Sequence, residues 1–123
     1  MNFEQYYMSK NDTSYVAKIF LYCKEKCLIL QKPNKKWQLP GGHVKNKEAI
    51  KDGLEREVYE ETGIEDFTYS LIKKDGNLYL YKGVTNTDRV RLSSEHIAYK
   101  WINTEELSKY NLTNVTLTQI KYV

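Results

Sequence analysis

The stretch GGHVKNKEAIKDGLEREVYEETGI, Gly41 to Ile64, places a glycine pair before a run with helical periodicity. Acids crowd the second half of this run, where Glu57, Glu60 and Glu61 fall within little more than one helical turn. Like charges at helical spacing repel each other, so this arrangement does not stabilise the helix by itself. The crowding therefore predicts a positively charged partner for the acids.

The same stretch predicts a helix over Lys47–Thr62. Asn46 is the expected N-cap, and Gly63 stands where a left-handed residue would end the helix. Gly53 costs the helix up to about 1 kcal/mol relative to alanine, which suggests that another part of the chain approaches the backbone closely there.

On a helical wheel the acids continue the apolar stripe of this helix. At about 100° per residue, one longitudinal stripe joins Ile50, Leu54, Glu57 and Glu61. Acids next to a core face are costly unless something neutralises them, and Arg56 lies well round the wheel from Glu57 and Glu61. A divalent cation is the economical partner, since Mg²⁺ takes oxygen ligands from carboxylates, water and phosphate. From the pattern alone, a solvated cluster of acids remains the alternative.

Outside this stretch, the chain reads as a sheet with covering helices. A loop is predicted over residues 33–42 and a short helix from Thr104, while the tail from Asn114 fits helix or strand. Strands are predicted at Ser14–Cys23, Cys27–Lys32, Phe67–Lys73, Asn77–Val84 and Ala98–Asn103. The fold class expected is therefore α+β.

Length and composition indicate one globular domain over residues 1–123, with a polar and aromatic N-terminal arm at residues 1–12 that contains Phe3, Tyr6 and Tyr7. Apolar residues make up 41% and charged residues 28%, and no apolar run is long enough for a membrane span. The N-terminus lacks the order of a secretion signal, so we expect a cytoplasmic protein. The net charge of +3 suits polyphosphate ligands without requiring nucleic acid.

The sequence resembles the Nudix hydrolase superfamily, whose signature is G-x5-E-x7-R-E-U-x-E-E-x-G-U with U a bulky aliphatic residue. The segments WQLPGG (37–42) and EHIAYKW (95–101) also resemble the family's surroundings of this motif. Lys47 and Gly53 depart from residues that are common there, although neither is a presumed ligand. The signature positions are filled by Gly42, Glu48, Arg56, Glu57, Val58, Glu60, Glu61, Gly63 and Ile64.

The resemblance implies an α/β/α sandwich, with a mixed β-sheet between helices. It also implies hydrolysis of a nucleoside diphosphate linked to another group, with Mg²⁺ or Mn²⁺ as cofactor and a metal-activated water as nucleophile. Carried over by position, Glu57 and Glu61 are the expected metal ligands, followed by Glu60 and the Gly41 carbonyl.

The resemblance implies further roles for other motif residues. Arg56 would orient a glutamate, and Glu48 would be a structural acid near the helix start. Gly42 would allow a close approach to the backbone, and Gly63 would end the helix. The resemblance leaves open whether Glu57 or Glu95 is the general base.

Three residues are candidates for contact with substrate. Lys32 and Lys36 would contact phosphate, and Trp37 would stack on a base. Solvated lysines and a packed tryptophan are the alternatives.

The expected substrate is a nucleotide or nucleoside polyphosphate, bound by a monomer or homodimer. RNA 5′-cap hydrolysis is the second enzymatic possibility. A non-catalytic module that binds nucleotide or RNA on the same fold is the alternative from another class, because fold alone does not establish function.

Overall fold

The structure is a computed structural model that describes residues 15–122, so the N-terminal arm predicted at residues 1–12 lies outside the described residues. The strands are β2 (Val16–Cys23), β3 (Lys26–Gln31), β4 (Trp37–Gln38), β5 (Gly41–His43), β6 (Phe67–Asp75), β7 (Leu78–Thr85) and β8 (Ala98–Ile102). The helices are α1 (Ile50–Thr62), the 3₁₀ helix η1 (Thr104–Lys109), α2 (Asn114–Gln119) and the 3₁₀ helix η2 (Ile120–Tyr122).

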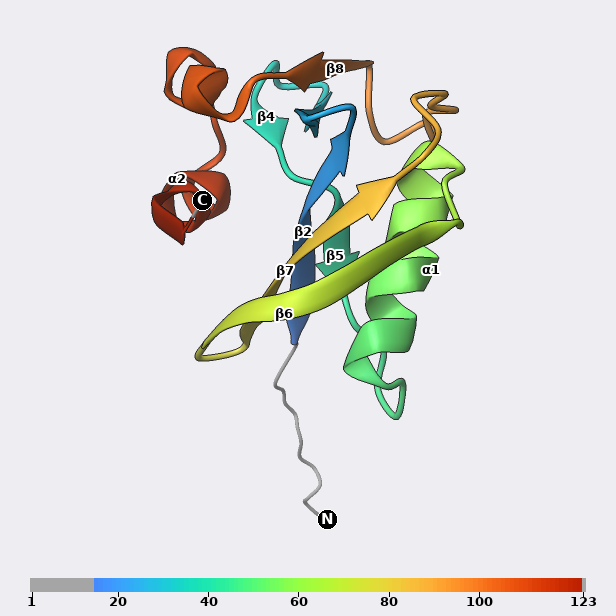
Figure 1. The fold of residues 1–123 in the computed structure, drawn as a ribbon. Coiled ribbons are helices and arrows are strands. Elements are labelled where there is room, and N and C mark those ends of the chain that lie inside the picture. Colours follow the sequence, from blue (N-terminus) through green and yellow to red (C-terminus); the bar gives the residue numbers. More distant parts are fainter. Residues whose placement is uncertain (1–14, 123) are drawn as a thin grey trace.

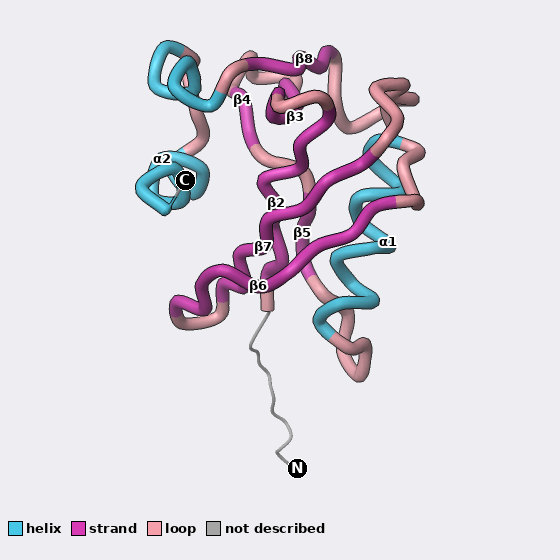
Figure 2. Tube along the Cα trace, viewed as in Figure 1, coloured by secondary structure: helices cyan, strands magenta, loops and turns pink. Residues whose placement is uncertain are grey.

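These strands form one mixed sheet. Its main path runs β4-β3-β2-β7-β6, while β5 pairs with β2 and β8 pairs with β3. The β2–β7 pair is parallel and the other pairs are antiparallel. The predicted α+β class with a mixed sheet is confirmed, and Figure 2 shows the strands running between helices on either side.

Strand β2 lies at the centre, and both of its faces are buried. Ala17, Ile19 and Leu21 pack on the face that α1 covers with Leu54. Phe20 belongs to a second apolar cluster, which also contains Leu107 of η1 and Leu112. Figure 1 shows α2 on the side of the sheet away from α1. A strand covered on both sides reads as an almost continuous apolar run, as VAKIFLYC does apart from its lysine.

The predicted start of the central helix is wrong. Helix α1 begins at Ile50, because Lys47 adopts a left-handed φ of 69° and Ala49 is extended. Asn46 is therefore not the N-cap. The predicted end is confirmed, since Gly63 has φ 76° and donates its N–H to the Tyr59 carbonyl.

Two other segments refine the sequence prediction. The predicted loop over residues 33–42 contains β4 and the start of β5. The tail is helical, with the Thr113 side chain accepting the Thr116 N–H as the cap of α2. No helix within residues 15–122 is long and apolar enough to cross a membrane.

Candidate functional site

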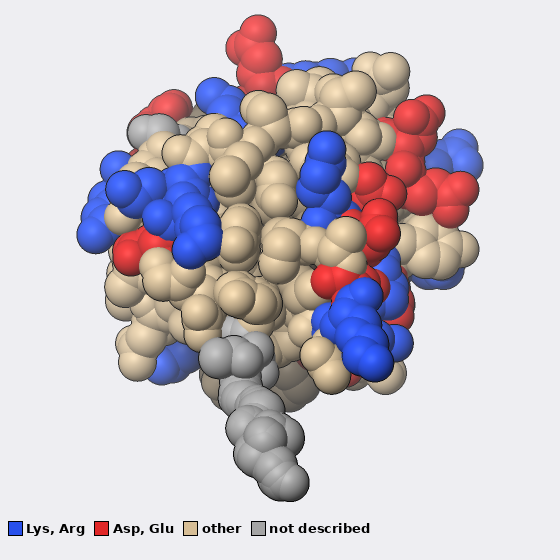
Figure 3. Space-filling model, turned by 90° about the horizontal axis from the view of Figure 1, so that it is seen from below, with Lys and Arg blue, Asp and Glu red and all other residues tan. Residues whose placement is uncertain are grey.

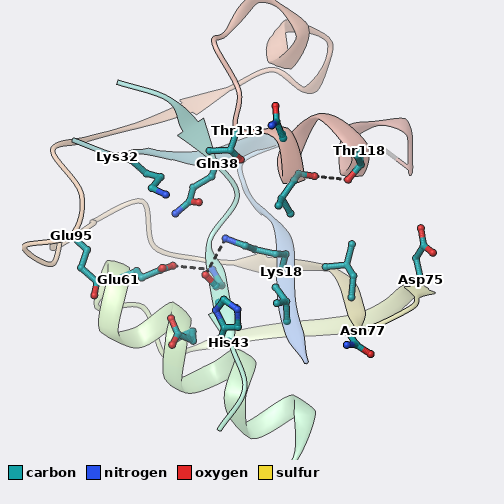
Figure 4. A pocket seen from close by; sticks show the side chains of 17 residues that line it. Lys18, Lys32, Gln38, His43, Glu61, Asp75, Asn77, Glu95, Thr113 and Thr118 are labelled. Atoms are coloured by element: carbon teal, nitrogen blue, oxygen red, sulfur yellow. Dashed lines mark hydrogen bonds between the residues drawn. The ribbon is translucent and has the colours of Figure 1, made fainter. Parts of the chain in front are cut away.

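A cavity of about 950 Å³ opens beside β2 and has two chemically different ends (Figure 4). We call one the carboxylate end, formed by Lys18, Lys32, Gly41, Gly42, Glu57, Glu61 and Glu95. We call the other the hairpin end, formed by Asp75, Asn77, Leu78, Asn114, Val115 and Thr118. Figure 4 shows Lys18 between the two groups of labelled side chains.

Strand β5 carries the glycine pair to the carboxylate end by pairing with β2, with Gly41 opposite Lys18. Gly41 has φ 119°, and a Cβ there would lie 2.1 Å from the Ala17 carbonyl oxygen. Only glycine fits such a position without strain. The close approach directs the Gly41 N–H to Glu61 Oε1 at 2.8 Å.

The second glycine leaves room for a carboxylate. A Cβ on Gly42 would lie 2.5 Å from Glu57 Oε1 and 2.8 Å from its Cδ. Glu57 therefore packs directly against the Gly42 backbone, and both are exposed to the cavity. This contact explains in physical terms why a glycine precedes the acidic helix.

Glu61 is almost enclosed, with 4% of its surface exposed. Burial raises the pKa of its carboxyl, and the charges of Glu57 and Glu95 add to that rise. The Lys18 ammonium and the Gly41 N–H oppose it by stabilising the charged form. Glu61 is thus a carboxylate whose charge depends on its neighbours.

Arg56 joins the acids of the motif into one network. Its guanidinium donates to Glu48 at 2.8 Å and 3.0 Å, to Glu57 Oε2 at 3.0 Å and to the His43 carbonyl at 3.0 Å. The wheel argument against Arg56 as a partner of Glu57 is wrong, because the long side chain reaches round the helix. Hydrogen bonds from Arg56 and from the Lys45 N–H hold the pKa of Glu48 well below its usual range.

Glu60 lies apart from the other acids. Its side chain is 52% exposed, accepts a hydrogen bond from Arg56 at 3.2 Å, and does not line the cavity. To reach a cation beside Glu57 it would have to turn away from Arg56. Its role as a metal ligand stays a prediction.

Glu95 does reach the carboxylate end, as predicted, although it comes from the loop before β8. The next residue, His96, is only 6% exposed, and its Nε2 hydrogen-bonds to the Gln38 side chain at 2.8 Å. Burial lowers the pKa of His96. A neutral imidazole therefore anchors the loop that carries Glu95.

The three predicted substrate contacts separate in the structure. Lys32 lines the cavity, whereas Lys36 does not. Trp37 is 8% exposed and packs edge-on against Tyr110 with ring centroids 5.6 Å apart, so stacking of Trp37 on a base is wrong. Its ring is part of the core.

Lys18 is the main site residue that the sequence prediction missed. Burial lowers its pKa, while the charges of Glu61 and Glu57 raise it. The available signal was a single lysine within the apolar strand VAKIFLYC. The hairpin end was missed as well, because its residues come from segments that no motif marks.

The donor set fits Mg²⁺ or Mn²⁺. Among residues 15–122, no three His, Cys, Asp or Glu side chains converge as a complete metal cage. Magnesium, however, commonly binds through one or two carboxylates, with water and substrate phosphate completing its shell. Glu57, Glu61 and the Gly41 carbonyl would hold the cation, and all three residues line the cavity.

Comparison with known proteins agrees with this geometry. The family model described as NUDIX domain matches residues 13–122. A protein of Invertebrate iridescent virus 3, called Putative hydrolase 111R, is 34% identical over 110 residues, covering 81% of this chain and 64% of the viral protein. The chain thus spans less than two thirds of that relative.

Two solved structures share the fold. The Ap4A hydrolase of C. elegans, in a binary complex, superposes with a TM-score of 0.72 at 25% identity, covering 89% of this chain and 94% of that chain. The MutT protein from Methanosarcina mazei Go1 superposes with a TM-score of 0.67 at 25% identity, covering 89% of this chain and 91% of that chain. Both similarities confirm the predicted arrangement of a mixed sheet with helices.

Proposed function

Because the chain belongs to the NUDIX domain family, we propose that it is an Mg²⁺- or Mn²⁺-dependent hydrolase of a phosphoanhydride bond in a nucleoside diphosphate-linked substrate. One observation carries the proposal: Glu57 and Glu61 are held side by side against the glycine pair, inside a cavity that also contains Lys32. This arrangement combines oxygen ligands for a cation with a positive charge for phosphate.

The chain's own residues divide the work. Arg56 binds Glu57 Oε2, which leaves Oε1 beside Gly42 and directed to the cavity. In this position Glu57 accepts the proton of the attacking water, with Glu95 as the alternative base. A carboxylate base placed in this way typically raises the reaction rate by about 10²–10⁴-fold. The bound cation supplies charge neutralisation on the phosphates and a lowered pKa for water.

The substrate class we propose is a nucleotide or nucleoside polyphosphate. The phosphates would lie at the carboxylate end, near Lys32. The hairpin end offers amide, hydroxyl and apolar groups from Asn77, Asn114, Thr118 and Leu78, which suit an uncharged ring with polar edges. The C. elegans neighbour, described as an Ap4A hydrolase, is compatible with this class.

The test is a substrate panel with product identification, run with Mg²⁺ and with Mn²⁺. The panel contains NTPs, dNTPs, ADP-ribose, nucleotide sugars, dinucleoside polyphosphates and capped RNA. We expect metal-dependent cleavage of one class, reduced about 10²–10⁴-fold in Glu57→Gln. Glu65→Gln is the matched control, since it makes the same change at an exposed acid just beyond α1.

Each outcome has a clear meaning. Full turnover in Glu57→Gln would exclude Glu57 as the base and move the role to Glu95. Cleavage of capped RNA alone would favour decapping. No cleavage by folded protein that binds Mn²⁺ would favour a non-catalytic binding module.

A further inference from the structure

Lys18 is an unusual residue for its position. It lies in the central strand between Ala17 and Ile19, which are both fully buried, and only 7% of its own surface is exposed. Lysine is rarely buried to this degree unless it is paired. We therefore expect its ammonium to have specific partners at the carboxylate end.

The hydrogen bonds of Lys18 identify these partners. Nζ donates to the Leu39 carbonyl at 3.0 Å and to the Gly41 carbonyl at 3.1 Å. The second oxygen is the one that the family motif assigns to the metal. Gly41 cannot turn this oxygen elsewhere, because its backbone is paired with β2 and its N–H is bound to Glu61.

The charged groups around Lys18 also connect it with the proposed metal ligands. Glu61 and Glu57 are the acids whose charges act on Lys18, while Lys32 adds a like charge. One ammonium thus donates to the oxygen that a divalent cation would use, and its charge interacts with the same two carboxylates. Two cations this close repel strongly in a buried site.

We propose that Lys18 is a built-in counter-cation of the metal site, which holds the Gly41 carbonyl and competes with the divalent cation for it. This rests on the proposed function, since it assumes that Gly41, Glu57 and Glu61 hold the metal. When the cation binds, the lysine releases the Gly41 oxygen and keeps the Leu39 oxygen. The flexible side chain makes this exchange without moving the strand.

A purely structural role predicts the opposite result. If Lys18 only braces the turn from Leu39 to Gly41, its removal leaves the Gly41 carbonyl less well oriented and weakens metal binding. If it competes, its removal strengthens metal binding. The sign of the change therefore separates the two roles.

The experiment titrates chelator-treated protein with Mn²⁺ alone and follows free Mn²⁺ by electron paramagnetic resonance. Lys18→Met keeps the side-chain length and suits the apolar strand. We expect it to bind Mn²⁺ at least about tenfold more tightly than wild type, because a nearby buried positive charge is removed. Lys32→Met is the charge control and should produce a smaller gain, since it breaks no bond to Gly41.

A second readout uses thermal unfolding. Without metal, Lys18→Met should unfold at a lower temperature than wild type, because Glu61 loses its counter-charge. Mn²⁺ should then raise its melting temperature more than that of wild type, since a ligand stabilises the state that it binds more tightly. Equal or weaker Mn²⁺ binding by Lys18→Met would overturn the proposal.

The wild-type protein provides an independent check. In carbon-13 NMR of lysine-labelled protein, Mg²⁺ should shift the Lys18 Cε resonance more than that of Lys32. No such shift at saturating Mg²⁺ would also overturn the proposal. Failure of wild type and Lys18→Met alike to bind Mn²⁺ would instead contradict the metal-dependent function as well.

Discussion

The two ends of the cavity differ in how firmly their side chains are held. At the carboxylate end, Gly41, Glu57 and Glu61 are fixed by hydrogen bonds from buried or half-buried partners and by glycine contacts too close for any other residue. At the hairpin end, Asn77 and Asn114 are exposed. The first end is therefore built for one geometry, and the second is free to change with the ligand.

Acidic groups are denser near the carboxylate end, although the hairpin end also carries Asp75. Seen from below, acidic side chains gather mainly on the side of α1, interleaved with basic ones, and uncharged residues fill the middle (Figure 3). Catalytic groups need pre-organised positions, because a displacement near 1 Å can cost about 10²-fold in rate. Groups that only recognise a ligand tolerate more movement. Substitutions at the two ends should therefore have different kinetic signatures.

Gly42→Ala should have the largest effect. The new Cβ would lie 2.5 Å from Glu57 Oε1, so either the carboxylate or β5 has to move. We expect kcat/KM to fall about 10²-fold, because the base and metal ligand lose their position. This value is measured by steady-state kinetics on the best substrate of the panel. A melting curve confirms that the variant is folded.

Gly76→Ala is the matched control at the other end. A Cβ on Gly76 meets nothing within 4 Å, although its φ of 59° makes alanine mildly strained. We expect some loss of thermal stability and an unchanged kcat. A wild-type rate in Gly42→Ala would show that the carboxylate end is less rigid than its contacts indicate.

Asn114→Ala tests the hairpin end and should have an intermediate effect. Loss of one side-chain hydrogen bond to a ligand weakens binding by up to about tenfold. We expect KM to rise for some members of the panel and not for others, with kcat preserved. An equal fall in kcat for every substrate would place Asn114 in the chemistry and remove the distinction between the two ends.

The same division explains what the sequence could predict. The carboxylate end lies mostly within one continuous segment, so helical spacing identified Glu57 and Glu61, and the fold followed from the motif. The position of Arg56 was misjudged because a wheel records where Cα atoms lie, whereas a long guanidinium reaches round the helix to Glu57. Lys18 was visible only as a lysine in an apolar strand.

The hairpin end was beyond sequence reasoning for a topological reason. Parallel pairing of β2 with β7 puts Val16 opposite Leu78 and so brings the β6–β7 turn to the cavity. The register between strands this far apart along the chain cannot be predicted from a single sequence. The start of α1 was missed because the turn before it is closed by the Glu48 side chain, which accepts the Lys45 N–H at 2.8 Å.

Gly53→Ala should have the smallest effect and tests why the motif helix contains a glycine. A Cβ at this position would lie 2.9 Å from Val44 Cγ2 and 3.1 Å from Glu48 Oε1, which supports the close approach expected from the sequence. Alanine favours the helix by up to about 1 kcal/mol, but the buried, short Val44 side chain has little room to give way. We expect the steric cost to exceed this gain slightly, with a net loss below about 1 kcal/mol in the free energy of unfolding from urea denaturation. In a Val44→Ala background the contacts with Val44 Cγ1 and Cγ2 disappear and the approach to Glu48 Oε1 at 3.1 Å remains, so the same change should cost less or become stabilising. Stabilisation in both backgrounds would show that Val44 does not require the glycine.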